Sequence, residues 1–509
     1  MSGNGNERSV WVLRAGGRGG RPYGRLPVAR AGVSPTLGGI AGPEDAASLR
    51  RVRVPAPALK RRLPSGRGAT EQPNITGDGA APLTWRFWIA LVLTGVATGL
   101  FGDFMMWVLF SFEHLAFGQG SGDFQTQVER ATGLRRVVSL MIAGVFGGVA
   151  WYLLRRYLKG ETEVDEAIWA KDAKLSSARS FLTGVISEVV IGLGASIGRE
   201  SAPKLMGGVS GSVSSQWLGL TEGQRRLLVA CGAGAGLAAV YNVPLGGALF
   251  AAELLVGSVA LPVVLPAIAC SAIATFVGWL YLPRHATYLN LPSYRFGMSL
   301  LVWALLFGPV IGLIASGYIR VIGWVSHRRA TGRQVLIAMP VAFTIVGLIG
   351  VAYPALFGNG KDMAHRAFLG QGSILLLLAL FALKPVATAL CLGAGASGGL
   401  FTPFMSTGAV FGGFVGQLWI LLWPGSPAGA YALVGAAAML GASIQAPLAG
   451  LVLVLELTRG GFDLMVPIMV ATFLATLVAR QVDGYSIYSA RLPGHRKPGK
   501  RRVAGQPPG

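Results

Sequence analysis

Apolar segments follow one another closely from Trp85 to Gln481, the first of them long enough to cross a lipid bilayer, and they constrain the fold more than any other feature. A helix needs about 20 apolar residues to span the hydrocarbon core. Only 13% of all residues are charged, while 52% are hydrophobic, which is unusual for a soluble domain. The sequence therefore predicts an all-α polytopic membrane protein.

The net charge of +22 lies largely outside the apolar region. Residues 1–82 are rich in Arg, Gly and Pro and have no sustained apolar period, which predicts a disordered basic tail. Residues 491–509 form a second, short basic tail. Basic flanks follow the positive-inside rule, so we expect cytoplasmic termini on a cell (inner) membrane protein and no nucleic-acid partner.

The first two spans are expected at Trp85 to Phe112 and at Val137 to Leu154, with a polar loop between them. Arg155 and Arg156 close the second span, which favours the cytoplasmic side for that end. The segment from Gly160 to Ser180 is the most acidic in the chain. We expect it to be a solvated loop or a helix start.

Glycine and proline break the apolar stretches repeatedly from Phe181 onward, so many pieces are too short for a simple spanning helix. Irregular backbone at membrane depth is tolerated where it is buried in protein or lines a cavity. Discontinuous helices of this kind form the substrate sites of many transporters. The pattern of breaks therefore favours a transport protein.

One broken stretch, from Gly192 to Lys204, carries Arg199, Glu200 and Lys204 inside the apolar region. Ionisable groups at membrane depth are costly and mark ion pathways or paired sites. A glycine turn that leads into a helix start also collects free N–H groups and positive dipole ends. The stretch predicts an ion site that contains Glu200, whereas Lys204 fits either a mouth-lining cation or a snorkelling side chain.

An internal repeat divides the apolar region into two halves, roughly 84–290 and 298–490. Gly194-Ala195-Ser196 recurs at Gly395-Ala396-Ser397, a shift of 201 (395 − 194). Pro244-Leu245-Gly246-Gly247 recurs at Pro447-Leu448-Ala449-Gly450, a shift of 203 (447 − 244). In transporters built from repeats, the substrate site lies where corresponding broken helices of the two halves meet.

At these residues the chain resembles the CLC family of chloride channels and chloride/proton antiporters. Gly198-Arg199-Glu200-Ser201-Ala202-Pro203 is similar to the family motif GREGP with one residue inserted before the proline. Gly399-Leu400-Phe401-Thr402-Pro403 matches the family motif GxFxP. Tyr488 falls where the family has its inner-gate tyrosine. The resemblance covers about residues 83–490.

This resemblance implies two inverted halves whose broken helices meet at a midplane anion site, and a homodimer with one pathway per subunit. Glu200 would be the gate, which occupies an anion position when charged and leaves it when protonated or displaced. The residues that the resemblance assigns to the anion are Gly198, Arg199, Gly399, Leu400, Phe401 and Tyr488.

Two departures from the family pattern limit what can be carried over. The region of the family's GSGIP motif reads Lys159-Gly160-Glu161-Thr162-Glu163-Val164, so Thr162 is the hydroxyl left to contact the anion. Leu254 stands where the antiporters have the glutamate that hands protons inward. Glu253 is the neighbouring candidate relay, although one residue turns a helix by about 100°.

Three functions are compatible with these residues. The favoured one is glutamate-gated transport of chloride or a similar small anion, with channel-like, uncoupled flux as in voltage-gated members. The alternatives are a chloride/proton antiporter and a non-conducting regulatory membrane protein of the same fold. No enzyme motif has its companions, the five histidines show no metal spacing, and we expect no cofactor.

Overall fold

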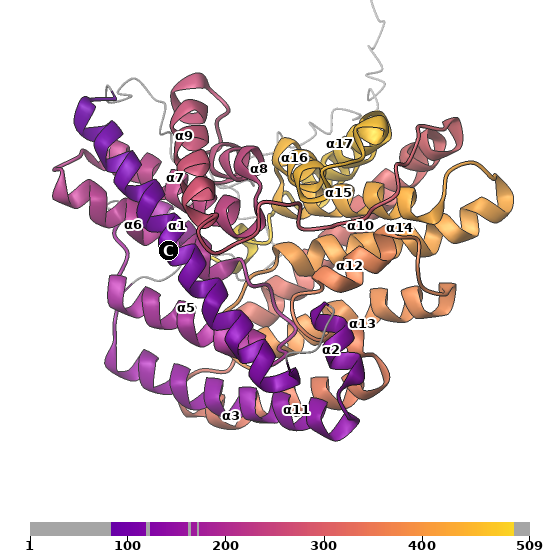
Figure 1. Ribbon diagram of the computed structural model, residues 1–509, viewed down its shortest axis with the longest axis horizontal. Coiled ribbons are helices and arrows are strands. Elements are labelled where there is room, and N and C mark those ends of the chain that lie inside the picture. The colour runs from indigo at the N-terminus through magenta and orange to yellow at the C-terminus, as the bar shows by residue number, and fades with distance from the viewer. Residues whose placement is uncertain (1–82, 119–122, 161–163, 170–172, 493–509) are drawn as a thin grey trace, which may run out of the picture. The chain divides into compact units, whose positions relative to one another are not determined.

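The computed structural model describes residues 83–118, 123–160, 164–169 and 173–492 (Figure 1). All of them belong to one compact unit of the chain. The described residues form helices without a β-strand, and eight of these helices are long and apolar enough to cross a membrane. The all-α polytopic fold is therefore confirmed. The predicted basic tail over 1–82 and nearly all of the one over 491–509 lie outside the described residues.

The first half of the repeat holds the elements from α1 to α9. Their bounds are α1 (Trp85–Phe117), α2 (Phe124–Arg130), α3 (Gly133–Tyr157), α4 (Val164–Trp169), α5 (Ser177–Gly192), α6 (Ser201–Trp217), α7 (Glu222–Tyr241), α8 (Pro244–Leu249), the π-helical η1 (Phe250–Val256) and α9 (Leu261–Gly278). The first two spans are thus longer than predicted, and the polar loop between them contains α2.

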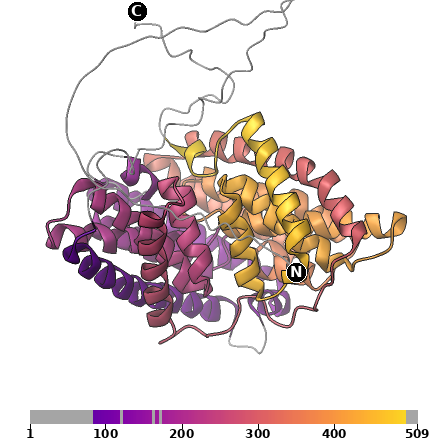
Figure 2. The same cartoon turned by 90° about the horizontal axis from the view of Figure 1, so that it is seen from above.

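The second half follows after an irregular segment, residues 279–297. Its elements are α10 (Met298–His327), η2 (Gly332–Gln334), α11 (Val335–Ala352), η3 (Pro354–Leu356), α12 (Lys361–Phe368), α13 (Ile374–Gly393), α14 (Phe401–Leu422), α15 (Ala428–Ile444), α16 (Pro447–Thr458), η4 (Phe462–Leu464), α17 (Met465–Val482) and η5 (Ser489–Arg491). Figure 2 shows most helices of the two halves gathered on opposite sides.

Capping residues in the sequence explain where several of these helices begin. The Thr84 hydroxyl accepts a hydrogen bond from the Phe87 N–H at the start of α1. Thr221 and Gln224 form a capping box at the start of α7. Each cap satisfies N–H groups that the first helical turn leaves without a partner.

The repeat read from the sequence recurs in the backbone at matching positions. Gly194 and Gly395 both adopt positive φ, at 111° and 100°, and each lies just after a helix that breaks before the site. Asn242 and Gln445, with φ of 57° and 59°, end α7 and α15 in the left-handed conformation. Proline then starts α8 and α16. The two halves therefore share these backbone features at the positions of the repeated motifs.

The helices that follow the two motifs cross their neighbours at closely spaced glycines. A Cβ on Gly207 of α6 would collide with the Gly232 carbonyl of α7, and a Cβ on Gly232 would collide with the Gly207 carbonyl. Gly408 of α14 and Gly435 of α15 form the corresponding contact in the second half. These crossings hold α6 and α14 rigidly, so their N-terminal ends are fixed in position.

The two halves also cap each other's helices. The Glu253 carboxylate, from η1, accepts the N–H groups of Leu448 and Ala449 at the start of α16, at 3.3 and 2.7 Å. The Glu456 carboxylate, from α16, accepts those of Leu245 and Gly246 at the start of α8, at 3.1 and 2.6 Å. This reciprocity is what an approximate two-fold axis between the halves produces.

Candidate functional site

The two sequence motifs meet directly in a short antiparallel β-bridge. The Gly198 N–H donates to the Gly399 carbonyl at 2.8 Å, and the Gly399 N–H donates to the Gly198 carbonyl at 2.7 Å. A Cβ on Gly399 would collide with the Glu200 carboxylate. Glycine at this position leaves room for the carboxylate, and the bridge brings the starts of α6 and α14 together around Glu200.

The Glu200 carboxylate is buried, with 2% of the residue exposed. One of its oxygens accepts the Phe401 backbone N–H at 2.7 Å, at the first residue of α14. The other lies 3.3 Å from the hydroxyl oxygens of both Thr402 and Tyr241. These two oxygens are 2.8 Å apart, so one hydroxyl donates to the other and the second donates to the carboxylate. A carboxylate from one half thus occupies a helix N-terminus of the other, which is a position suited to an anion.

Arg199 directly precedes Glu200 in the chain, and its guanidinium packs against two aromatic rings. Its guanidinium is 5.0 Å from the ring centre of Tyr241 and 6.0 Å from that of Phe110. Guanidinium groups are attracted to ring faces in this way. Because Arg199 keeps its proton, it supplies a fixed positive potential next to Glu200.

Lys204 lies one turn further along α6 and is held from two sides. Its Nζ is 2.9 Å from the Asp165 carboxylate, and both residues are 8% exposed. The same Nζ lies 4.2 Å from the ring centre of Tyr488. The snorkelling interpretation of Lys204 is therefore wrong. Within the acidic segment, a helix begins at Val164, as one of the two alternatives predicted, but Asp165 is buried against the lysine and is not solvated.

Lys384, on α13, is a fully buried lysine that the sequence reasoning missed. Its Nζ donates to the Ser196 hydroxyl at 2.9 Å and to the carbonyl groups of Gly358 and Leu356 at 2.8 and 3.2 Å. All three acceptors are neutral, and one of them, Ser196, lies in the segment that precedes Gly198. Lys384 is the only charged residue of its apolar run, and this was the available signal.

Glu188, on α5, is a second buried group that was missed. The residue is fully buried, and neither carboxylate oxygen has a hydrogen-bond partner among the described residues. The charges that act on it are those of Arg199, Glu200 and Glu113. A buried carboxyl group without a partner is costly when ionised, so Glu188 is best suited to hold a proton.

The structure brings together most of the residues that the sequence assigned to the site. Gly198, Arg199, Gly399, Leu400 and Phe401 all lie at the junction with Glu200. Tyr488, with 9% exposed, lies beyond Lys204. Tyr241 also contacts Glu200, although nothing in its position in the sequence indicated this. Thr402, which contacts Glu200 as well, belongs to the second motif.

Two predicted residues do not join this group. Thr162 falls outside the described residues. Glu253 lies with its carboxylate on the N-terminus of α16, so the geometry gives it a structural contact, and its relay role stays a prediction. Within the described ranges, no group of three or more His, Cys, Asp or Glu side chains is arranged to hold a metal ion.

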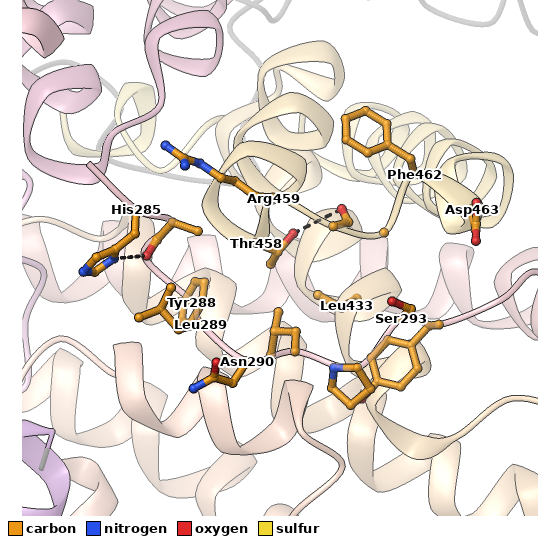
Figure 3. Close-up of a pocket in the computed structure, with 16 residues that line it drawn as sticks. His285, Tyr288, Leu289, Asn290, Ser293, Leu433, Thr458, Arg459, Phe462 and Asp463 are labelled. Carbon is orange, nitrogen blue, oxygen red and sulfur yellow. Dashed lines mark hydrogen bonds between the residues drawn. The ribbon is translucent and has the colours of Figure 1, made fainter. Parts of the chain in front are cut away.

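A cavity of about 470 Å³ lies between the segment after α9 and the end of α16 (Figure 3). The segment after α9 forms one wall with His285 and Tyr288, and the end of α16 forms another with Thr458 and Arg459. None of the residues that the sequence assigned to the site lines this cavity. The candidate site is therefore the junction of the two motifs.

Comparison with known proteins agrees with this geometry. The family model for voltage gated chloride channels matches residues 143–480, more than half of the chain. The chain belongs to the voltage-gated chloride channel (CLC) family. Together with the apolar helices, this membership makes it an integral, multi-pass membrane protein.

Curated relatives in the CLC family span most of the described region. A ClcB-like chloride channel protein of Ralstonia nicotianae is 30% identical over 357 residues, which cover 66% of this chain and 80% of the relative. The voltage-gated ClC-type chloride channel ClcB of Shigella flexneri is 28% identical over 397 residues, which cover 75% of this chain and 93% of the relative.

Solved CLC structures share the fold. A slow cyanobacterial Cl⁻/H⁺ antiporter matches with a TM-score of 0.70 and 22% identity, covering 80% of this chain and 97% of the other. A CLC-type fluoride/proton antiporter matches with a TM-score of 0.61 and 19% identity, again covering 80% of this chain and 97% of the other. At these identities the likeness describes the fold.

Proposed function

We propose that the chain moves chloride or a similar small inorganic anion across a lipid bilayer, with Glu200 as the gate. The observation that carries the proposal is the hydrogen bond from the Phe401 N–H to the Glu200 carboxylate. Carboxylates and small anions compete for the same N–H groups at helix starts. Family membership, and the chloride channel names of the curated relatives, support the same function.

The proposed gating cycle uses only this competition. When the Glu200 side chain takes up a proton or is displaced, the Phe401 N–H and the positive end of α14 become available to an anion. Backbone groups of Gly198, Gly399 and Leu400 would line the same position. The fixed charge of Arg199 would raise the local anion concentration. Tyr488 would donate its hydroxyl from the inner side, with Thr162 as a further hydroxyl.

Reconstitution into liposomes tests the proposal. Vesicles loaded with chloride and containing the purified protein should release it after a potassium ionophore clamps the voltage, faster than empty vesicles. Nitrate and fluoride loads would identify the preferred anion. Release equal to that of empty vesicles for every anion would reject transport and favour the non-conducting, regulatory alternative.

Uncoupled, channel-like flux is the form of transport that we favour. A coupled exchanger needs a second protonatable group besides Glu200, and Leu254 occupies the family's usual position for it. Glu253, the neighbouring candidate, already uses both carboxylate oxygens at the start of α16. A channel needs only the pathway and the gate.

Exchange of chloride for protons is the second candidate function, and Glu188 is the observation that favours it. This buried carboxyl group lies among Glu200, Arg199 and Glu113 without a hydrogen-bond partner in the described part of the chain. Antiporter structures also share the fold. Proton movement driven by a chloride gradient would establish coupling, and its loss in Glu188→Gln with chloride flux retained would assign the relay.

The remaining parts of the proposal concern the assembly. We propose a homodimer in the cell (inner) membrane with one pathway per subunit and with both termini in the cytoplasm. Basic residues at the C-terminal ends of α3 and α10 support this orientation through the positive-inside rule.

A further inference from the structure

A second cavity lies between helices on the outside of the second half. Its volume is about 880 Å³, within the range of sites that hold small molecules, about 300–1,000 Å³. Its walls come from α10, α11 and α13, and Thr407 of α14 lies at its floor. None of the residues assigned to the anion site lines it. We call this cavity the α10–α13 groove.

The α10–α13 groove is lined mainly by apolar side chains, several of which are exposed on the surface of the helices. The lining residues Val321, Val341 and Val386 are about half exposed, at 47%, 53% and 49%. Such a surface on a membrane protein faces lipid tails. A hydrocarbon chain therefore fits the chemistry of the groove.

One end of the groove is basic. Arg328 lines it and is exposed, and its guanidinium lies 4.5 Å from the ring centre of Trp324. Arg155 approaches the same end from α3, where it donates to the Gly395 carbonyl at 2.6 Å, beside the lining residue Ala394. Tryptophan and arginine at the end of an apolar helix mark the depth of lipid headgroups.

We propose that the α10–α13 groove binds an anionic phospholipid, with an acyl chain in the groove and the phosphate at Arg328 and Arg155. Charge complementarity selects the occupant, because basic pockets between membrane helices bind anionic headgroups. The exposed Arg329 and Arg333 extend the same positive surface.

The groove also reaches the helix that holds the gate. Tyr318, which lines it, stacks on Phe404 of α14 with ring centres 3.8 Å apart and planes 13° apart. Phe404 lies one turn after Phe401, whose N–H binds Glu200. A bound acyl chain would therefore pack against the support of α14.

Gly317 makes the proposal testable without damage to the fold. It lines the groove, and a Cβ built there meets nothing within 4 Å. Gly317→Leu therefore places a four-carbon side chain in the space proposed for the acyl chain, while Arg328→Gln removes a headgroup contact. Gly223→Leu, at another open helical glycine, controls for the added side chain. Arg86→Gln controls for charge, because Arg86 also lies over a tryptophan, Trp85.

Native mass spectrometry of the purified protein with added phosphatidylglycerol or phosphatidylcholine measures the binding. We expect phosphatidylglycerol to be retained preferentially, with retention lowered about fivefold by Arg328→Gln, as for one charge near a membrane surface. Gly317→Leu should abolish it, and both control variants should retain it. Equal retention of the two lipids, or unchanged retention by Gly317→Leu, would overturn the proposal.

Discussion

Glu200 and Lys204 lie one helical turn apart, but their charges meet different kinds of partner. The Lys204 ammonium is paired with the Asp165 carboxylate. The Glu200 carboxylate is held by a backbone N–H and by the hydrogen-bonded hydroxyl pair of Thr402 and Tyr241. When the Glu200 carboxylate moves away from these neutral donors, no ion pair is broken. A small anion can then accept the same hydrogen bonds. Glu200 is therefore suited to move, whereas Lys204 is suited to stay.

The buried Lys204–Asp165 pair gives a stability prediction. Lys204→Met should lower the free energy of unfolding by about 3–5 kcal/mol, because Asp165 is left as an uncompensated buried charge. Adding Asp165→Asn to this variant should restore a large part of the loss. Thermal unfolding in detergent measures both. A double variant no more stable than Lys204→Met alone would contradict the pairing.

Glu129 and Arg366 form a second ion pair outside the spanning helices, with contacts of 2.6 and 2.9 Å. Burial raises the pKa of Glu129, but hydrogen bonds from Arg366 and Gln125 outweigh it and leave the pKa below its ordinary value. The folded protein thus binds fewer protons than the unfolded chain. The contribution of this pair to the free energy of unfolding should be fully present above the pKa of glutamate in the unfolded chain, about 4.3. It should be lost as the pH falls through the lower pKa that Glu129 has in the folded protein.

Arg366→Gln tests this pH dependence. Because the pair is about one-third exposed, its contribution is small, about 1 kcal/mol or less. The difference in melting temperature between the parent and the variant should be largest near neutral pH and vanish in acid. A difference that stays constant with pH would show that the pair does not contribute.

At the scale of the helix, the glycine crossings fix the ends that form the site. Gly207 and Gly232 let α6 and α7 approach so closely that a Cβ on either would meet the other's backbone. Backbone atoms cannot rotate away as a flexible side chain can. The start of α6, which carries Glu200, is therefore held by packing along the rest of that helix.

Gly207→Val should destabilise the protein by about 3 kcal/mol or more, at or beyond the upper end of ordinary overpacking. Gly223→Val, at an open helical position, serves as the matched control and should change stability little. Thermal unfolding measures the difference. Equal melting temperatures for the two variants would contradict the close crossing of α6 and α7.

The elements themselves were largely predictable from sequence, and the side-chain partners were not. The breaks around Gly194 and Gly395 depend on positive φ angles, which favour glycine. Such breaks, and the repeat that relates them, can therefore be read from the residue types in the sequence. The contact of Tyr241 with Glu200 joins positions 41 residues apart and depends on how α7 packs. Lys384 and Glu188 were visible as lone charges in apolar runs, but their surroundings arise only from tertiary packing.

At the scale of the whole molecule, the halves hold each other through the reciprocal caps of Glu253 and Glu456. Glu253→Ala and Glu456→Ala should each lower stability by about 1 kcal/mol, as expected for a lost helix cap. Thermal unfolding in detergent tests this expectation. Unchanged melting temperatures in both variants would contradict the account that these caps hold the halves together.

The same pair of variants separates a cap from a proton relay. Glu456 makes the same contact as Glu253 but lies at no predicted relay position, so it is a matched control. If Glu253 only caps α16, both variants should leave any chloride-driven proton movement in liposomes unchanged. Loss of proton movement in Glu253→Ala alone would restore the relay assignment.

The central claim is that the Glu200 carboxylate competes with the transported anion, and chloride efflux from liposomes at acidic and neutral pH tests it most directly. The parent protein should release chloride faster in acid, where Glu200 takes up a proton. Glu200→Gln should release chloride at one rate at both pH values, at least as fast as the parent in acid. A Glu200→Gln variant with the parent's rates and pH dependence would contradict the account.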